Sequence, residues 1–161
     1  MDRYEGLWRD GNFDGYGVLK FKNGEKYDGF FSEGNFEGKG AFSYQDGSKY
    51  DGVWARGQKS GLGVYQYEDG SKLTGQFEND AISGLVNITY DDGGQYNGYY
   101  ENNQIHGRGR MEYASKDIYE GRFGSELKEG FGIYKWEDGS IYAGFWSKDK
   151  PQGFGISVTQ S

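Results

Sequence analysis

Short runs rich in aromatic and apolar residues alternate along the chain with turns rich in Gly, Asp and Asn. The pattern repeats every 23 residues without insertion or deletion, and the last copy is incomplete. Runs such as "YDGVW" and "GLGVYQY", within residues 50–67, are typical of β-strands. A fixed short period predicts a repeat array in which each unit contributes one hairpin. The units open at Tyr4, Tyr27, Tyr50, Leu73, Tyr96, Tyr119 and Tyr142.

Glycine and aromatic residues recur at fixed positions when each unit is numbered from its opening residue. Positions 3 and 12 are Gly in every unit, and position 14 is Gly in all but one, where Val86 stands. Position 5 is always aromatic, and position 18 is aromatic in the first six units. Because 28 of the 30 glycines fall on five repeat positions, glycine here specifies backbone geometry and does not indicate disorder.

The turns between units, such as Asn23-Gly24 and Asp46-Gly47, are strong hairpin signals. A two-residue loop would separate the aromatic residues of positions 16 and 18 from those of positions 1 and 5. A three-residue loop, a type I turn ending in a left-handed glycine, places all of them on one face. We therefore predict the three-residue loop, in which position 12 lies opposite position 5 of the next unit. In this register Arg110 lies opposite Glu120.

The predicted fold class is all-β: an elongated, twisted antiparallel β-meander of stacked hairpins forming a single-layer sheet, with residues 1–161 as one array. The remaining loop of each unit carries Gly, Asn or Asp at position 8 in most units, and these residues tolerate positive φ. Glu126 stands there in the sixth unit and tolerates it less readily. We therefore expect its loop to differ locally.

At the fixed tyrosine, glycine and aromatic positions of the repeat, the chain resembles the MORN repeat family, whose pattern runs Tyr-x-Gly-x-Trp, Gly-x-Gly and a turn with Gly. The resemblance covers residues 4 to 161, and the main departures are Leu73, Val86 and Lys116, the last replacing a turn glycine. It implies a non-catalytic scaffold, since MORN proteins include cytoskeletal, ciliary and junctional scaffolds. The family also includes membrane-binding arrays and arrays fused to lipid-kinase, methyltransferase or exchange-factor domains.

Composition narrows the classes of protein that fit. Only 34% of the residues are hydrophobic and 19% are aromatic, so burial must depend mainly on rings. The chain has no cysteine, and its N-terminus is not a signal peptide, so we expect a cytoplasmic protein. The resemblance to MORN proteins implies an association with the cytoskeleton or with membranes. The net charge of −7 is spread along both halves, which argues against binding to nucleic acid.

The residues that could support catalysis or metal binding are few. His106 is the only histidine, so neither a Ser-His-Asp triad nor a histidine metal cluster can form. The Gly-x-Gly pairs lack the third glycine and the helix of a phosphate-binding loop. Carboxylate pairs such as Asp91-Asp92 lie in hairpin turns without the spacing of a calcium loop. We therefore predict no enzymatic activity, no cofactor and no metal site.

The ring-lined face is the predicted binding site. Glycine pairs such as Gly40 and Gly52 would leave a bare strip between the rings, along which a helix or an extended peptide of a protein partner could lie. Acidic rims favour a basic or amphipathic segment, in keeping with a cytoskeletal partner. The alternative is that the rings lie flat over the strip and hold the sheet together. The predicted groove residues are Tyr27, Phe31, Tyr44, Tyr50, Trp54, Tyr67, Phe77, Tyr90, Tyr96, Tyr100, Tyr113, Tyr119 and Phe123.

The sequence is also compatible with three other roles. A phosphoinositide or membrane site would use the position-23 row of Lys26, Lys49 and Lys72, although neighbouring carboxylates dilute this charge. The array is also compatible with being the non-catalytic arm of a larger enzyme. Finally, open sheet edges at the two ends predict self-association.

Overall fold

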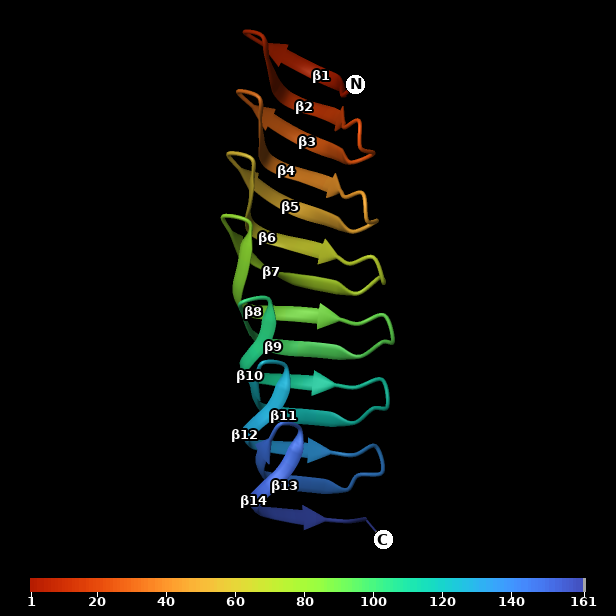
Figure 1. Ribbon diagram of the computed structural model, residues 1–161, viewed down its shortest axis with the longest axis vertical. Coiled ribbons are helices and arrows are strands. Elements are labelled where there is room, and N and C mark those ends of the chain that lie inside the picture. The colour runs from red at the N-terminus through yellow and green to blue at the C-terminus, as the bar shows by residue number, and fades with distance from the viewer. Residues whose placement is uncertain (161) are drawn as a thin grey trace. The chain divides into compact units, whose positions relative to one another are not determined.

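The structure, a computed structural model, describes residues 1–160. Fourteen strands follow one another in chain order in one open antiparallel sheet, which confirms the predicted all-β meander of hairpins (Figure 1). No helix occurs within these 160 residues. The chain divides into two compact units, Met1–Ala81 and Ile82–Ser161, which are described separately below.

The strands alternate between seven and nine residues in length, so every repeat has a short and a long strand. The first unit contains β1 (Arg3–Arg9), β2 (Asn12–Lys20), β3 (Lys26–Ser32), β4 (Asn35–Ser43), β5 (Lys49–Ala55), β6 (Gln58–Gln66) and β7 (Lys72–Glu78). The second unit contains β8 (Ala81–Thr89), β9 (Gln95–Glu101), β10 (Gln104–Glu112), β11 (Ile118–Gly124), β12 (Leu127–Lys135), β13 (Ile141–Ser147) and β14 (Lys150–Val158).

The turn between repeats has the predicted three-residue form. The N–H of Phe21 donates to the carbonyl of Glu25 at 2.9 Å, and the N–H of Gly24 donates to the carbonyl of Phe21 at 3.0 Å. Gly24 has φ = 95°, the left-handed conformation that closes such a turn. As a result, position 12 lies opposite position 5 of the next repeat, as in the pairs Gly15 with Phe31 and Gly130 with Trp146.

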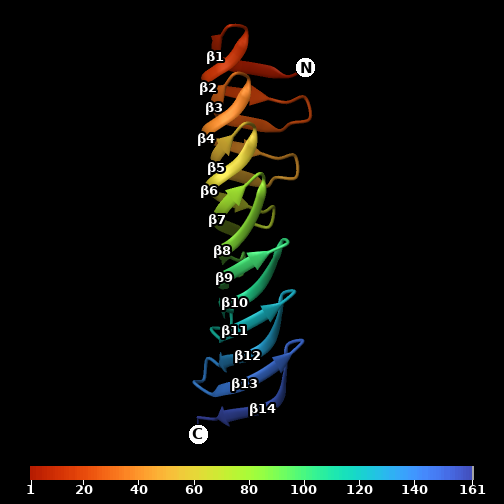
Figure 2. The same cartoon turned by 90° about the vertical axis from the view of Figure 1, so that its left-hand side faces the viewer.

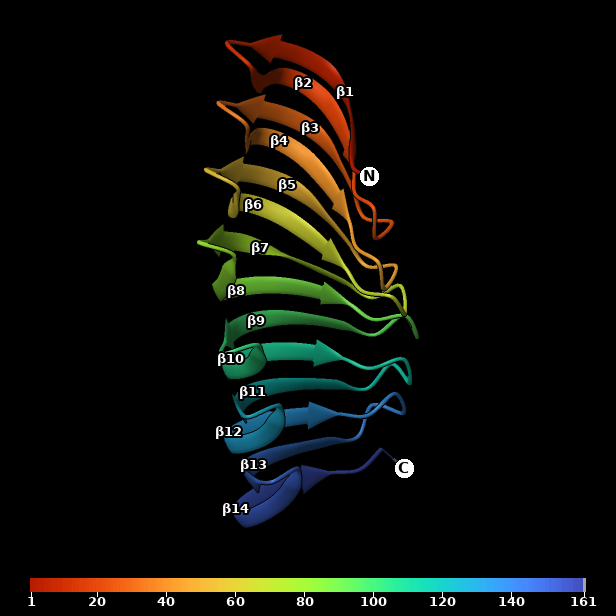
Figure 3. The same ribbon diagram turned by 45° about the horizontal axis from the view of Figure 1, so that its top comes forward.

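Each repeat also contains a bend that the sequence did not predict. In the first hairpin Gly6 pairs with Gly17, whereas Trp8 pairs with Phe13, so the long strand carries two extra residues between these pairs. Gly15 lies within this bulge and has φ = 73°, and the other position-12 glycines also have positive φ. This requirement explains why position 12 is always Gly. The bend turns the end of the hairpin back over one face, as seen in Figure 2 and Figure 3.

The expectation that the Glu126 loop would differ was wrong. Ser125 and Glu126 have φ of 48° and 69°, close to the 49° and 67° of Asn79 and Asp80 in the corresponding loop of the fourth repeat. The pairing of Gly124 with Leu127 leaves only two residues to close the hairpin. Such a tight loop requires positive φ at both residues, so the strand pairing overrides the preference of the Glu side chain.

Candidate binding surfaces

The face that carries positions 1, 5, 16 and 18, here called the inner face, has no bare strip. The opening tyrosines lie flat over the glycines of positions 3 and 14. A Cβ built on Gly63 would lie 2.5 Å from ring and hydroxyl atoms of Tyr50. The Tyr50 hydroxyl donates to the carbonyl of Val53 at 3.0 Å, and Tyr27 makes the same bond to Phe30 at 2.9 Å. The interpretation of an open glycine strip was therefore wrong, because a tyrosine is long enough to span both glycines and reach an acceptor.

In the first three repeats and in the sixth, the other side of the opening tyrosine ring is covered by the side chain at position 10, on the bent part of the hairpin. Phe36 stacks on Tyr27 with ring centroids 3.8 Å apart and planes inclined by 12°. Phe31 and Trp54, both at position 5, contact the same ring edge-on at 5.0 and 5.5 Å. Tyr27 is consequently 0% exposed. Sequence reasoning missed position 10 because its residue type changes among Phe, Lys, Ile and Pro, which leaves no fixed signal.

The predicted groove residues therefore fall into two groups. The four at position 18, Tyr44, Tyr67, Tyr90 and Tyr113, stay accessible: Tyr67 is 38% exposed and the other three are half-buried. Trp136, which continues this row in the second unit, is 37% exposed. The other nine are buried and pack the sheet: Tyr27, Phe31, Tyr50, Trp54, Phe77, Tyr96, Tyr100, Tyr119 and Phe123.

Exposed carboxylates lie in the turns, two residues after the accessible rings along the chain. In the first unit the side chains of Asp46 and Asp69 accept the backbone N–H two residues ahead, at 2.9 and 2.8 Å. Asp92 and Asp138 do the same in the second unit, both at 2.8 Å. Hydrogen bonds from the Ser48 hydroxyl and backbone hold the pKa of Asp46 below its usual value. The carboxylates therefore serve the turn geometry and still present negative charge beside the rings.

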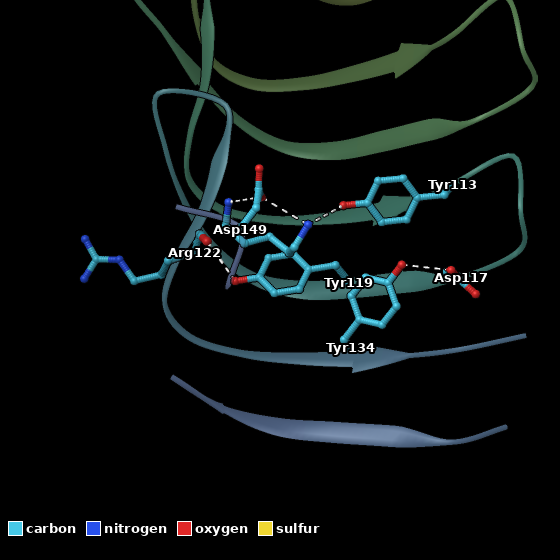
Figure 4. Close-up of polar contacts among 7 residues, drawn as sticks. Tyr113, Asp117, Tyr119, Arg122, Tyr134 and Asp149 are labelled. Carbon is cyan, nitrogen blue, oxygen red and sulfur yellow. Dashed lines mark hydrogen bonds and ion pairs between the residues drawn. The ribbon is translucent and has the colours of Figure 1, made fainter. Parts of the chain in front are cut away.

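A lysine occupies position 10 in the third and sixth repeats and is surrounded by aromatic rings. In the second unit the Lys128 ammonium lies 5.5–5.8 Å from four ring centroids, within cation–π range. It donates to the Tyr113 hydroxyl at 3.3 Å and lies 3.1 Å from a carboxylate oxygen of Asp149 (Figure 4). The Tyr134 hydroxyl donates to Asp117 at 2.8 Å, which fixes another ring of this cage. Only 14% of the Lys128 side chain is exposed.

The first unit holds a similar cage around Lys59. Its ammonium lies 5.3, 5.6 and 5.7 Å from the ring centroids of Tyr44, Tyr50 and Tyr65. The Asp80 carboxylate accepts the backbone N–H of Lys59 at 2.8 Å. Burial lowers the pKa of Lys59, and the negative charge of Asp80 opposes this shift. We call these two groups the Lys59 cage and the Lys128 cage.

The opposite face, which carries positions 2, 4, 13, 15 and 23, is here called the outer face. Lys26, Lys49 and Lys72 lie on this face of the first unit, and the Lys26 ammonium is 2.8 Å from Asp28. In the second unit the outer face has a depression of about 760 Å³ over β8 to β12. Arg110 lies in it and forms the predicted pair with Glu120, at 3.1 Å.

Residues 1–160 hold few groups that could support other chemistry. His106 is exposed. No group of three or more His, Cys, Asp or Glu side chains in this part of the chain could hold a metal ion. The same residues include no helix that is long and apolar enough to cross a membrane.

The repeat pattern, with a covered opening tyrosine in each matching unit, agrees with a protein-family comparison. The MORN repeat model matches residues 4–26, 27–49, 50–72, 96–118, 119–141 and 142–158. The chain belongs to the MORN repeat family. The MORN repeat model does not match residues 73–95, where Leu73 and Val86 replace the opening tyrosine and a glycine.

Solved structures were found to be similar to this MORN repeat protein at low sequence identity, and the first of them shares its fold. One is the TCP domain of SAS-4 (dCPAP) from Drosophila melanogaster, in complex with a proline-rich motif of Ana2 (dSTIL). It is 15% identical, with a TM-score of 0.56, and the alignment covers 99% of this chain and 90% of that chain. The TCP10 domain of Danio rerio CPAP is 14% identical, with a TM-score of 0.30 and coverage of 89% and 78%. No curated protein sequence matches the chain.

Proposed function

We propose that this MORN repeat chain is a non-catalytic scaffold that binds a basic, proline-containing segment of a protein partner on its inner face. The site would be the row of position-18 rings together with the acidic turns beside them, in each unit separately. The family resemblance makes a cytoskeletal, ciliary or membrane-junction assembly the setting that we propose.

The observation that carries the proposal is the accessible ring row itself. Successive rings in a row are one repeat, or two strands, apart, which corresponds to about 9.6 Å. A polyproline II segment has three residues per turn and rises about 9.3 Å in one turn, so every third residue would meet the next ring. Aromatic surfaces bind such segments with little loss of conformational entropy. The proline-rich motif bound by the SAS-4 domain supports this class of ligand for the fold.

The charge of the ligand follows from the turns. Exposed carboxylates follow the rings by two residues along the chain, at Asp46, Asp69, Asp92 and Asp138. Arginine or lysine in the segment would pair with these carboxylates, and arginine would also stack on tyrosine rings. An acidic segment would be repelled.

The test is fluorescence anisotropy with a labelled peptide of repeated Arg-Pro-Pro triplets, and with a Glu-Pro-Pro peptide as the control. We expect only the basic peptide to bind. Tyr67→Ala and Trp136→Ala should each weaken binding about tenfold, as truncation of a central aromatic contact typically does. Both side chains are more than a third exposed, so both variants should retain the circular dichroism spectrum of the parent. Unchanged affinity in both folded variants would contradict the proposal.

A further inference from the structure

The outer face of the second unit carries a charge arrangement that the fold does not require. Positions 4 and 13 of neighbouring repeats pair across strands, and in this unit they form three successive pairs: Leu85 with Tyr99, Arg108 with Arg122, and Phe131 with Phe145. All six side chains are exposed. Two arginines directly opposite each other destabilise a sheet, whereas an aromatic or aliphatic pair would stabilise it.

Arg108 and Arg122 also lack the neighbouring carboxylates that neutralise a third arginine, Arg110. Arg110 lies 3.1 Å from a carboxylate oxygen of Glu120 and 3.2 Å from one of Glu112. Within residues 1–160, neither Arg108 nor Arg122 forms an ion pair with a carboxylate.

A nearby carboxylate does not neutralise the pair either. Glu129 is opposite Arg122 in the register of β11 and β12, but its carboxylate lies over Gly124. The pair therefore presents two positive charges to solvent on a protein whose net charge is −7.

The surface around the pair is hollowed. Both arginines line the depression of about 760 Å³, and Leu85 and Phe131 line it on either side of them along the sheet. Its floor includes backbone of the glycine pairs, which brings main-chain atoms close to the surface. The order along the sheet is therefore apolar, cationic, apolar.

We propose that this depression binds an acidic segment of a protein partner in the polyproline II conformation, with the pattern apolar-x-x-Glu-x-x-apolar. The three outer-face pairs are each two strands apart, about 9.6 Å, which matches one polyproline II turn of about 9.3 Å. One glutamate would reach the Arg108 and Arg122 guanidinium groups. The flanking apolar residues would lie on Leu85 and Phe131. This site is on the opposite face from the one in the proposed function and does not depend on it.

A segment of a protein fits this site better than an anionic membrane does. A membrane surface is broad, so it would bring the chain's acidic side chains close to negatively charged lipid. A narrow peptide can meet the arginine pair without most of these side chains, and the one carboxylate that lines the depression, Glu120, is paired with Arg110. Fork-shaped guanidinium groups also favour a carboxylate that accepts two parallel hydrogen bonds.

The experiment uses the full chain and a labelled peptide, Leu-Pro-Pro-Glu-Pro-Pro-Phe, in anisotropy titrations at physiological salt. Arg108→Gln and Arg122→Gln should each weaken binding about tenfold, in the range for loss of a charge-assisted bond. The same substitutions should leave the urea midpoint unchanged or raise it, because each removes a like-charge repulsion. A purely structural role for either arginine would lower that midpoint instead.

Matched controls distinguish binding at the arginine pair from a general effect of charge and from binding at the inner face. Arg56→Gln, an equal change of charge on an exposed residue of the first unit, should leave binding unchanged. A peptide with Gln in place of Glu, and one with Glu displaced by a single residue, should bind at least tenfold more weakly, in the same range for a lost charge-assisted bond. Trp136→Ala should not affect this peptide, although it should weaken the Arg-Pro-Pro peptide.

Three results would overturn the proposal. They are equal binding of the Glu and Gln peptides, unchanged affinity in both folded arginine variants, and a dependence on Arg108 and Arg122 seen only with phosphatidylserine vesicles. The last result would assign the arginine pair to a lipid surface.

Discussion

Lys59 and Lys128 occupy the same repeat position in the two units, yet different groups stabilise their ammonium charges. Lys128 has the Asp149 carboxylate at 3.1 Å and a hydroxyl acceptor on Tyr113 at 3.3 Å. Both Asp149 and Asp80 accept the backbone N–H of their lysine at 2.8 Å, but Asp80 forms no ion pair with the Lys59 ammonium, and burial lowers the pKa of Lys59. The surrounding tyrosines come from positions 1, 16 and 18 in both cages.

The aromatic rings alone therefore do not determine how a buried ammonium charge is stabilised. Both lysines cover an opening tyrosine, as Phe36 does in the second repeat, so both serve the packing of the sheet. Only Lys128 has a direct ion pair that offsets the loss of hydration. The Lys59 ammonium depends on cation–π attraction and on the more distant charge of Asp80.

The largest effect should come from the position-14 glycine that lies under the opening tyrosine in each cage. A Cβ on Gly63 would lie 2.5 Å from Tyr50, and one on Gly132 would lie 2.5 Å from Tyr119. We expect Gly63→Ala and Gly132→Ala each to lower the free energy of unfolding by about 3 kcal/mol, because the added methyl group displaces a fully buried ring. Urea denaturation measures this loss. Clearly unequal losses of stability in the two variants would show that Gly63 and Gly132 are not equivalent.

A compensating pair of substitutions tests the cause of that loss. The fourth repeat already combines Leu73 with Val86 where the third has Tyr50 and Gly63. Gly63→Val alone should therefore destabilise strongly, whereas the double variant Tyr50→Leu, Gly63→Val should recover most of the stability. If the double variant is no more stable than the single one, the ring is not what excludes a side chain at position 14.

The next effect distinguishes the two cages directly. Lys128→Met should lower the free energy of unfolding by about 1–2 kcal/mol, because the Asp149 carboxylate loses its ion-pair partner and keeps only the bond from the backbone N–H of residue 128. Lys59→Met should change it by less than about 0.5 kcal/mol or raise it, because Met keeps the stem and removes an uncompensated charge. Equal losses in the two variants would show that the ion pair does not matter.

The pH dependence of stability should separate the contribution of the buried tyrosines from that of Lys59. Burial raises the pKa of Tyr50 and of Tyr119 to about 12, so above pH 10 the unfolded chain loses these protons before the folded chain does. Stability should therefore fall as the pH rises from 10 to 12. Lys59 acts in the opposite sense, since its lowered pKa makes its contribution rise with pH up to about 10.5. Urea midpoints from pH 8 to 12 for the parent and for Lys59→Met measure both terms, and the variant should lose only the rise.

The smallest effect concerns the turn next to each cage. Gly47 closes the turn beside the Lys59 cage with φ = 89°, whereas Lys116 adopts φ = 74° beside the Lys128 cage. A side chain in this left-handed conformation is strained, so Lys116→Gly should raise the free energy of unfolding by about 0.5–1 kcal/mol. Gly47→Lys should lower it by a similar amount. A loss of stability in Lys116→Gly would show that the Lys116 side chain makes a stabilising contact.

Much of the fold could be predicted because the information is local and repeated. The Asn23-Gly24 turn and the face shared by positions 1, 5 and 18 are sufficient to choose between a two- and a three-residue loop. That register correctly placed Gly15 opposite Phe31 and Arg110 opposite Glu120. The bend at position 12 could not be predicted in the same way, because a glycine with positive φ and one under a ring look identical in sequence.

The strand order, the register between repeats and the rows of rings follow from the amino-acid sequence, because they depend on a period and on turn chemistry. Which rings are accessible depends on the three-dimensional fold. The bend brings Phe36, Lys59 and Lys128 back over the opening tyrosines, and residues far apart along the strand come into contact there. The three-dimensional fold also determines that Arg108 and Arg122 are left unpaired while Arg110 is neutralised, since that depends on where each neighbouring carboxylate lies in space.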